Sequence, residues 1–397
     1  MTETQEKLKS LFHPGAGRIP PHLTGRKQEQ DFFHDCVARL LDRTSPDQDM
    51  IIYGPRGNGK TAMLRYLQKE TLEKTGKRLD IAWVTPRKLK TVDELARAIS
   101  GKDRKILEKV KSLGLSASIG IASLNAELDI SRAAAVTEDL LQEKSRKTPL
   151  VLIMDEAHNL TPDMAGILLD ASQNVRGEGC PFFLVMAGTP NLETTLQRSS
   201  ATFWDKSNVF PLGRLSVEDA RQALTIPLNS CQVACAQEVA EEIALRAYSY
   251  PYFIQIWGDC IASQLVAAGS RELTMDIVLE AEHTAIAKCT TVYRQRYNEL
   301  NKIGLIALAT DIAIAFDEFS DQYMPVQELE KLVRLSFQQQ GLPVTHEAVQ
   351  GDLQKLSHIG YIWEIAVSSE VEGEDPMLCY EPGIPSLMRF VRRQAPP

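Results

Sequence analysis

The sequence lacks the features of a zinc-binding, disulfide-bonded or membrane-spanning protein. Its seven cysteines include no C-x-x-C pair, and Cys231 and Cys235, one helical turn apart, have no second pair of ligands near them. No apolar run approaches the roughly 20 residues that span a bilayer. The polar start of the chain has no signal-peptide core. We therefore expect a cytoplasmic protein with reduced thiols and no membrane partner.

A strong charge of one sign is also lacking. The 397 residues include 44 Lys and Arg against 52 Asp and Glu, and the net charge is −8. This balance excludes a protein that coats nucleic acid over its whole surface. The charge is uneven, however. Residues 87–111 carry nine basic and four acidic side chains, whereas residues 301–397 carry seven basic and fourteen acidic ones.

The strongest motif is a glycine-rich loop between an apolar strand, Met50–Tyr53, and a segment from Ala62 that favours a helix. Backbone N–H groups of such a loop can curl round a phosphate, which side chains would obstruct. The lysine would reach the β- and γ-phosphates, and the threonine hydroxyl would hold Mg²⁺. The pattern G-x-x-x-x-G-K-T predicts a nucleotide-binding P-loop made of Gly54, Pro55, Arg56, Gly57, Asn58, Gly59, Lys60 and Thr61.

Two further strands bring polar side chains to the same place. The apolar run Leu150–Met154 has the character of a buried central strand and ends in Asp155 and Glu156. Asp155 would hold Mg²⁺ through its water shell, and Glu156 would polarise the attacking water. After a third apolar run, Thr189 or alternatively Asn191 could sense the γ-phosphate, although either could simply cap a helix.

The order of elements predicts an α/β parallel-sheet P-loop core followed by a helical lid and a winged helix. Strands alternate with helices up to about residue 214, helical periodicity alone follows, and three short helices and a ribbon end the chain. The predicted parts are a flexible arm over 1–18, an α/β ATPase domain over 19–214 with a basic helix and hairpin excursion at 87–128, a helical lid over 215–300, and a winged helix over 301–397.

With these residues in place, the chain resembles an AAA+ ATPase of the branch that includes origin-recognition and initiator ATPases and the STAND signalling ATPases. Gly54–Thr61 is similar to the Walker A loop, Leu150–Glu156 to the Walker B strand, and Thr189 to the sensor-1 position. The resemblance implies slow, partner-stimulated, Mg²⁺-dependent hydrolysis of ATP by a homo-oligomer that forms on ATP.

The resemblance also implies further contacts around the nucleotide. Pro20–Arg26 and Glu29 would pack on the adenine, and Pro251 would belong to a lid motif in which Ser249 replaces the usual glycine. Arg198 and Lys206 are the candidates for the arginine finger that completes a neighbouring subunit's site. A lysine there would weaken hydrolysis, because its point charge does not reproduce the planar fork of arginine.

Two functions remain open. In the first, the ATPase is DNA-associated and binds double-stranded DNA through residues 87–111, although a basic run of this kind can equally be a solvated helix face. The acidic winged helix is poorly suited to a duplex and is expected to bind a protein partner. The alternative is therefore a STAND-like nucleotide switch in signalling or defence. The chain has no N-K-x-D guanine reader and no second RecA-like half, which excludes a GTPase and a DEAH-type helicase.

Overall fold

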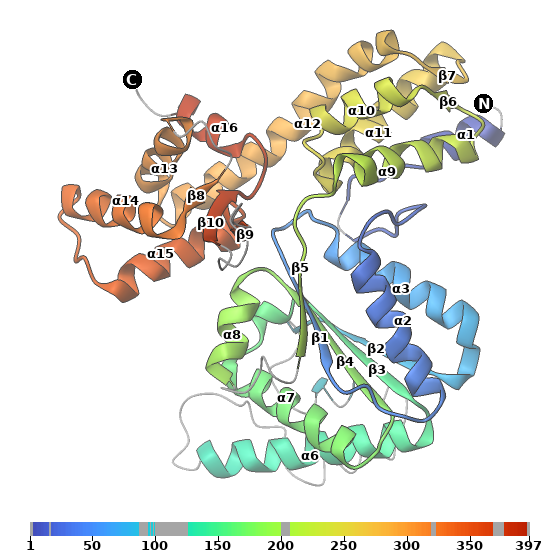
Figure 1. Cartoon of the computed structure of the whole chain (residues 1–397), viewed down its shortest axis with the longest axis vertical. Helices are drawn as coiled ribbons and strands as arrows, with labels where there is room; N and C mark the ends of the chain where they lie inside the picture. The colour runs from blue at the N-terminus through green and yellow to red at the C-terminus, as the bar shows by residue number, and fades with distance from the viewer. Residues whose placement is uncertain are drawn as a thin grey trace.

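The computed structural model describes residues 3–86 except residue 16, residues 94, 95, 97 and 99, and residues 126–199, 207–318, 323–367 and 377–394. The chain has an α/β region with two further bodies beside it (Figure 1). We call these the helical region, from α9 to α12, and the C-terminal region, from α13 to α16.

The α/β region is built on a five-stranded sheet in the order β2-β3-β4-β1-β5. Every neighbouring pair is parallel, which confirms the predicted parallel sheet. The carboxyl ends of β1, β3 and β4 therefore meet at one edge, which is where ligands bind in open α/β sheets. The strands are β1 (Asp49–Tyr53), β2 (Asp80–Val84), β3 (Leu150–Asp155), β4 (Phe182–Gly188) and β5 (Ser207–Pro211).

Helices cover both faces of this sheet (Figure 1). Successive residues of β3 alternate between two buried cores, as the two-residue period of a strand requires. Val151 and Ile153 pack in the core of α2 and α3, and Leu152 and Met154 pack in the core of α6 and α7. The helices are α2 (Lys27–Leu41), α3 (Lys60–Thr75), α6 (Ala126–Lys147), α7 (Pro162–Gly177) and α8 (Asn191–Ser199), with short 3₁₀ turns at Gly76–Arg78 and Ala157–Asn159.

The start of α6 differs from the predicted hairpin excursion. The helix begins at Ala126, so residues 126–128 are helical, in keeping with the high helix propensity of Ala, Glu and Leu. The remainder of the excursion lies outside the described residues. So does most of the basic segment 87–111, of which only residues 94, 95, 97 and 99 are described. Two of these, Leu95 and Ile99, are buried in the core of α6 and α7.

The N-terminal segment differs from the loose arm predicted for residues 1–18. It forms α1 (Glu3–Lys9), and Leu8, Leu11 and Phe12 are buried in the core of the helical region. Phe12 packs directly on Gly258 of α11, where a Cβ atom would overlap the ring. The segment is thus held by apolar contacts to a part of the chain about 250 residues away.

The helical region contains four helices and one short strand pair. Ser216 caps the first helix by accepting a hydrogen bond from the backbone N–H of Asp219 at 3.0 Å, as its sequence predicts. Pro251 begins α11, and Gly269 ends it in the left-handed conformation. The elements are α9 (Val217–Ser230), β6 (Ala234–Cys235), α10 (Gln237–Arg246), α11 (Pro251–Ala268), β7 (Glu272–Leu273) and α12 (Met275–Lys302).

The C-terminal region has the predicted helices followed by a ribbon, with a short first strand and a final helix in addition. Its strands form an antiparallel sheet in the order β8-β10-β9. The elements are α13 (Ile306–Glu318), β8 (Met324–Pro325), α14 (Val326–Gln339), α15 (His346–Ile359), β9 (Ile362–Val367), β10 (Met377–Pro382) and α16 (Leu387–Gln394).

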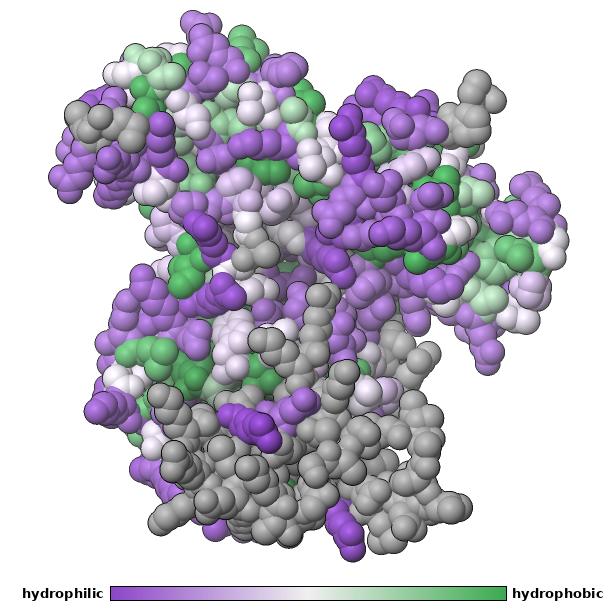
Figure 2. All heavy atoms as spheres, turned by 180° about the vertical axis from the view of Figure 1, so that it is seen from behind, coloured by the Kyte–Doolittle hydropathy of each residue, from purple (hydrophilic) through white to green (hydrophobic). Residues whose placement is uncertain are grey.

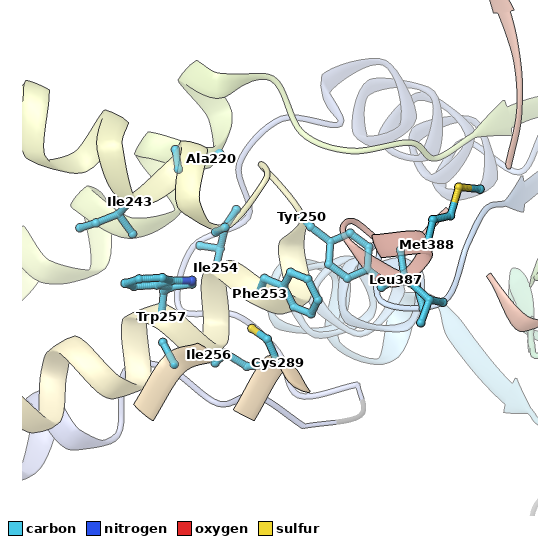
Figure 3. Packing of buried hydrophobic residues seen from close by; sticks show 14 of the residues in the cluster. Ala220, Ile243, Tyr250, Phe253, Ile254, Ile256, Trp257, Cys289, Leu387 and Met388 are labelled. Carbon is cyan, nitrogen blue, oxygen red and sulfur yellow. The ribbon is translucent and has the colours of Figure 1, made fainter. Parts of the chain in front are cut away.

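The helical and C-terminal regions share one apolar core. Figure 3 shows Leu387 and Met388 of α16 beside Tyr250 and Phe253 at the start of α11. On the face shown in Figure 2, hydrophilic residues predominate on both regions, and hydrophobic ones form small separate areas. Within the described part of the chain, no helix is long and apolar enough to cross a membrane.

Candidate functional site

The P-loop connects β1 to α3 at the carboxyl edge of the sheet. Gly57 and Gly59 have φ angles of 89° and 88°, in the left-handed region where glycine is favoured. The side-chain amide of Asn58 donates a hydrogen bond to the carbonyl of Leu212 at 2.9 Å. The backbone N–H of Gly54 donates to the carbonyl of Gly188 at 3.2 Å. These contacts tie the loop to the ends of β4 and β5.

Lys60 is buried inside the curl of this loop. Its Nζ donates hydrogen bonds to the carbonyls of Gly54 and Pro55, both at 2.7 Å. Burial lowers the pKa of the Lys60 ammonium from 10.5 to about 8, although the nearby carboxylates of Glu156 and Asp155 act in the opposite direction. The ammonium group is therefore placed where a phosphate could take over from the loop carbonyls.

Thr61 and Asp155 lie together beside the loop. The Thr61 hydroxyl is 3.1 Å from each carboxylate oxygen of Asp155, to which it donates a hydrogen bond. Burial raises the pKa of Asp155, and the hydrogen bond from Thr61 opposes that shift. A hydroxyl and a carboxylate at this separation fit Mg²⁺, a hard cation that takes few protein oxygens and retains several waters. The two predicted magnesium ligands are thus brought together.

Glu156 begins a tight turn immediately after Asp155. It has a φ angle of 62°, and its backbone N–H donates to Asp155 Oδ1 at 3.1 Å. The turn continues into His158, whose Nε2 lies 3.5 Å from Glu156 Oε2. A left-handed backbone at a residue other than glycine costs energy and is common at functional sites. The backbone at this turn therefore sets the direction in which the Glu156 side chain leaves the end of β3.

Thr189 follows β4 and is buried at the same edge. Its hydroxyl oxygen is 3.2 Å from Nδ1 of His358, a residue of α15. Nε2 of the same imidazole is 3.3 Å from Nη2 of Arg56 in the P-loop. The ring also meets His158 edge to face, with centroids 5.2 Å apart. Thr189 is thus at the predicted sensor edge, next to a histidine from another region.

The sequence-based prediction assigned no role to either of the two histidines at this edge, His158 and His358. His158 stands in the run Asp-Glu-Ala-His, where its position next to the carboxylates was a usable signal. His358 is the penultimate residue of a helix with no motif around it. Asn191, the alternative to Thr189, starts α8, and its buried Oδ1 accepts no hydrogen bond from the described residues.

The helical region reaches the P-loop through Tyr250. Its hydroxyl donates a hydrogen bond to the carbonyl of Arg56. A Cβ atom at Gly57 would overlap that hydroxyl, so glycine is required there by the close approach as well as by its backbone angle. The next residue, Pro251, lines a cavity that opens beside the P-loop. The predicted lid residue therefore lies beside this loop.

A cavity of about 570 Å³ opens beside the P-loop and extends to the N-terminal segment. Its walls include His13, Pro20 and Arg26 on one side and Arg296 of α12 on another. Burial lowers the pKa of Arg26, whose guanidinium donates to the carbonyl of Gly213. Of the predicted adenine contacts, Pro20, Arg26 and, between them, His22, Leu23 and Thr24 line the cavity, whereas Glu29 of α2 does not.

The candidates for the arginine finger are not brought to this cavity by any described contact. The backbone of Arg198 belongs to α8, but its side chain lies outside the described part of the structure, as does the whole of Lys206. Both therefore stay predictions.

Comparisons with known proteins support this geometry. Residues 43–196 match the family model described as AAA domain. No protein of curated function matches the chain. The Walker-type ATPase PABY2304 of Pyrococcus abyssi shares the fold with a TM-score of 0.59 at 12% identity, over 96% of this chain and 99% of that one. The ORC2 protein of Aeropyrum pernix in its ADPNP-ADP complexes shares the fold with a TM-score of 0.53 at 14% identity, over 96% of this chain and 97% of that one.

The matched segment begins before β1 and ends within α8, so it contains the P-loop, Asp155, Glu156 and Thr189. The similar solved structures extend the likeness in fold to the helical and C-terminal regions. Residues 43–196 therefore match an AAA domain, and over the rest of the chain the likeness to these ATPases is one of fold.

Proposed function

We propose that this protein binds and hydrolyses ATP with Mg²⁺ and that the bound nucleotide controls the contact between the C-terminal region and the catalytic edge. The observation that carries the proposal is the position of His358, between Thr189 and Arg56. Both partners belong to the loops expected to meet the γ-phosphate. Binding of ATP and docking of the C-terminal region would therefore involve the same groups.

The hydrolytic part of the proposal assigns one role to each side chain at the edge. Lys60 would bind the β- and γ-phosphates, and Thr61 and Asp155 would hold the ion. An ion held by these two side chains would supply positive charge against the charge that develops on the phosphate oxygens. Glu156 would orient and polarise the attacking water. The ORC2 relative has a similar fold and was solved in complexes named for ADPNP and ADP, which supports an adenine nucleotide here.

The test of hydrolysis is the Glu156→Gln variant, with Glu73→Gln on the exposed side of α3 as the matched control. We expect Glu156→Gln to bind ATP as tightly as wild type but to lose hydrolysis by a factor on the order of 100 or more, because a positioned general base contributes about 10²- to 10⁴-fold. Wild-type turnover in Glu156→Gln would remove the role assigned to that residue.

The switch is tested by small-angle scattering and mass measurement of Glu156→Gln without nucleotide, with ADP and with ATP. We expect ATP to change the radius of gyration as the C-terminal region leaves Thr189, and to favour a homo-oligomer. Identical scattering curves and masses in all three states would rule out the switch and leave a plain ATPase.

A second candidate function is association with double-stranded DNA. The charge of residues 87–111, nine basic against four acidic side chains, supports it, whereas residues 301–397 have the opposite balance and favour a protein partner. The discriminating experiment measures ATP turnover with added duplex DNA at rising salt. Stimulation that declines with salt supports DNA binding, and no response at low salt rejects it.

A further inference from the structure

We infer that His158 is a positioning residue for the hydrolysis proposed above, one that holds the Glu156 carboxylate in a fixed place relative to the loop of Thr189. The inference depends on the proposed ATP hydrolysis. It assigns to the histidine no contact with the nucleotide. Its basis is a chain of contacts that joins the ends of β3 and β4 through one imidazole ring.

The ring is enclosed between these two loops. The side chain of His158 is only 2% exposed, although the residue lies in the tight turn that begins at Glu156. A Cβ atom at Gly188 would lie 3.1 Å from the His158 backbone nitrogen, so the loop after β4 packs closely against the turn after β3. In this position the imidazole has little freedom to rotate.

The hydrogen bonds determine which ring nitrogen carries the proton. The backbone N–H of Thr189 donates to Nδ1 of His158 at 3.2 Å. Nδ1 must therefore be the unprotonated acceptor, and the neutral ring carries its hydrogen on Nε2. With this assignment, Nδ1 accepts a hydrogen bond from the Thr189 loop, and Nε2 can donate one on the other side of the ring.

The donor side of the ring faces the proposed general base. Nε2 lies 3.5 Å from Glu156 Oε2 and 3.3 Å from the side-chain nitrogen of Asn159. The amide nitrogen of Asn159 can only donate, and it donates to the Glu156 carbonyl at 3.0 Å. Of these two neighbours, therefore, only the Glu156 carboxylate can accept a hydrogen bond from Nε2. The contact is long in this structure, as catalytic hydrogen bonds often are before substrate binds.

One ring therefore couples the group that polarises water to the loop that senses phosphate. Removing the Nε2–H would leave the Glu156 carboxylate free to turn, and a misplacement of about 1 Å can cost about 100-fold in rate. The nucleotide contacts of Lys60 and Thr61 would be unaffected. We expect a loss in kcat without a comparable change in the affinity for ATP.

Two substitutions separate the contact of Nδ1 with Thr189 from the contact of Nε2 with Glu156. His158→Asn places an acceptor oxygen near the position of Nδ1 and has no group at Nε2. His158→Gln places an amide nitrogen near Nε2 and lacks the acceptor for Thr189. His34→Asn, on α2, is the matched control, because His34 is half-exposed and pairs with Glu70 on the other side of the domain.

The experiment measures kcat, KM and equilibrium ATP binding for all three variants, wild type and Glu156→Gln. We expect His158→Asn to lower kcat about 10-fold or more with KM within about twofold of wild type. His158→Gln should recover at least part of that loss, and His34→Asn should match wild type. Wild-type kcat in His158→Asn, or equal losses of ATP binding and kcat in both variants, would overturn the inference.

A second measurement does not depend on activity. In protein with ¹⁵N-labelled histidine, the signals absent from His158→Asn identify the ring of His158, and we expect them to report a proton on Nε2. A proton on Nδ1 would overturn the inference whatever the turnover. If wild type hydrolyses ATP no faster than Glu156→Gln, the proposed function itself fails; if it does hydrolyse ATP and His158→Asn matches it, only the inference fails.

Discussion

The hydroxyl oxygen of Thr189 lies 3.2 Å from the imidazole Nδ1 of His358, although 169 positions separate the two residues. The second ring nitrogen is 3.3 Å from the guanidinium of Arg56, which can only donate. His358 therefore accepts from Arg56 at Nε2 and donates to Thr189 from Nδ1. Burial, and then the positive charge of Arg56, lower the pKa of His358, which favours the neutral ring that this arrangement requires.

His358→Ala should bind ATP more tightly than wild type and turn it over faster. The substitution removes two hydrogen bonds that hold the C-terminal region on the loops expected to meet the γ-phosphate. Each such bond contributes roughly 0.5–1.5 kcal/mol, so the two together amount to about 1–3 kcal/mol and we expect a change of about 5- to 150-fold in Kd, measured by nucleotide fluorescence. His346→Ala, at the exposed start of the same helix, is the control. Weaker binding in His358→Ala would instead mean that the imidazole holds the nucleotide.

ATP binding should take up a proton at alkaline pH. The pKa of free Lys60 is lowered to about 8 by burial, and bound phosphates would raise it. Below pH 8 the ammonium is already charged and affinity is at its full value. Above pH 8 the free protein must gain a proton to bind, so affinity falls as pH rises. Calorimetry in two buffers of different ionisation enthalpy should give an uptake near one proton at pH 9 and near zero at pH 7. No uptake at pH 9 would contradict the assignment.

Gly57→Ala should impair the nucleotide site while leaving the sheet intact. The new methyl group would overlap the Tyr250 hydroxyl, and the φ angle of 89° is unfavourable for alanine. We expect a loss of ATP affinity on the order of tenfold, from a penalty of about 1–2 kcal/mol for the backbone angle alone. Gly177→Ala, where no atom lies within 4 Å of the added carbon, is the control. Equal ATP affinity in both variants would show that the approach of Tyr250 is dispensable.

Gly258→Ala should release the N-terminal segment from the helical region. The added carbon would overlap the ring of Phe12, which is buried and holds the segment in place. Loss of a buried phenylalanine costs roughly 3–5 kcal/mol, so the segment would depend on its remaining apolar contacts, chiefly those of Leu8 and Leu11. Limited trypsin digestion should cut after Lys7 and Lys9 faster in this variant than in wild type or Gly177→Ala. Unchanged digestion would mean that the segment is held by other contacts.

The sequence predicted best those features that depend on neighbouring residues. The short, uninterrupted apolar run before Asp155 predicts a strand buried on both faces, and β3 is such a strand. Pro251 and Gly269 mark the two ends of α11 through their backbone preferences alone. The sequence also predicted that the P-loop, Asp155 and Thr189 lie close together, because the strands of a parallel sheet have their carboxyl ends at the same edge.

Features that depend on distant partners could not be predicted in the same way. Leu8, Leu11 and Phe12 have no pattern that distinguishes a docked segment from a loose one, since they pack in a core formed by residues more than 200 positions away, and Phe12 lies on a bare glycine of α11. His358 lies on a helix that was expected, but its contact with Thr189 depends on how two regions pack. The hydrogen bond from Tyr250 to the P-loop depends on the same kind of packing, although Pro251 beside it is identifiable from the sequence.

Helix α12 connects the nucleotide cavity mechanically to the C-terminal region. It contains 28 residues without glycine or proline, so it has no built-in hinge and is about 42 Å long. Arg296 near its end lines the cavity, while Tyr293 and Tyr297 contact Phe390 of α16. These contacts all lie near the C-terminal end of the rod, so a tilt of about 10° there would displace its other end, in the helical region, by about 7 Å. Small adjustments around a phosphate would thereby become movements large enough for a partner protein to detect.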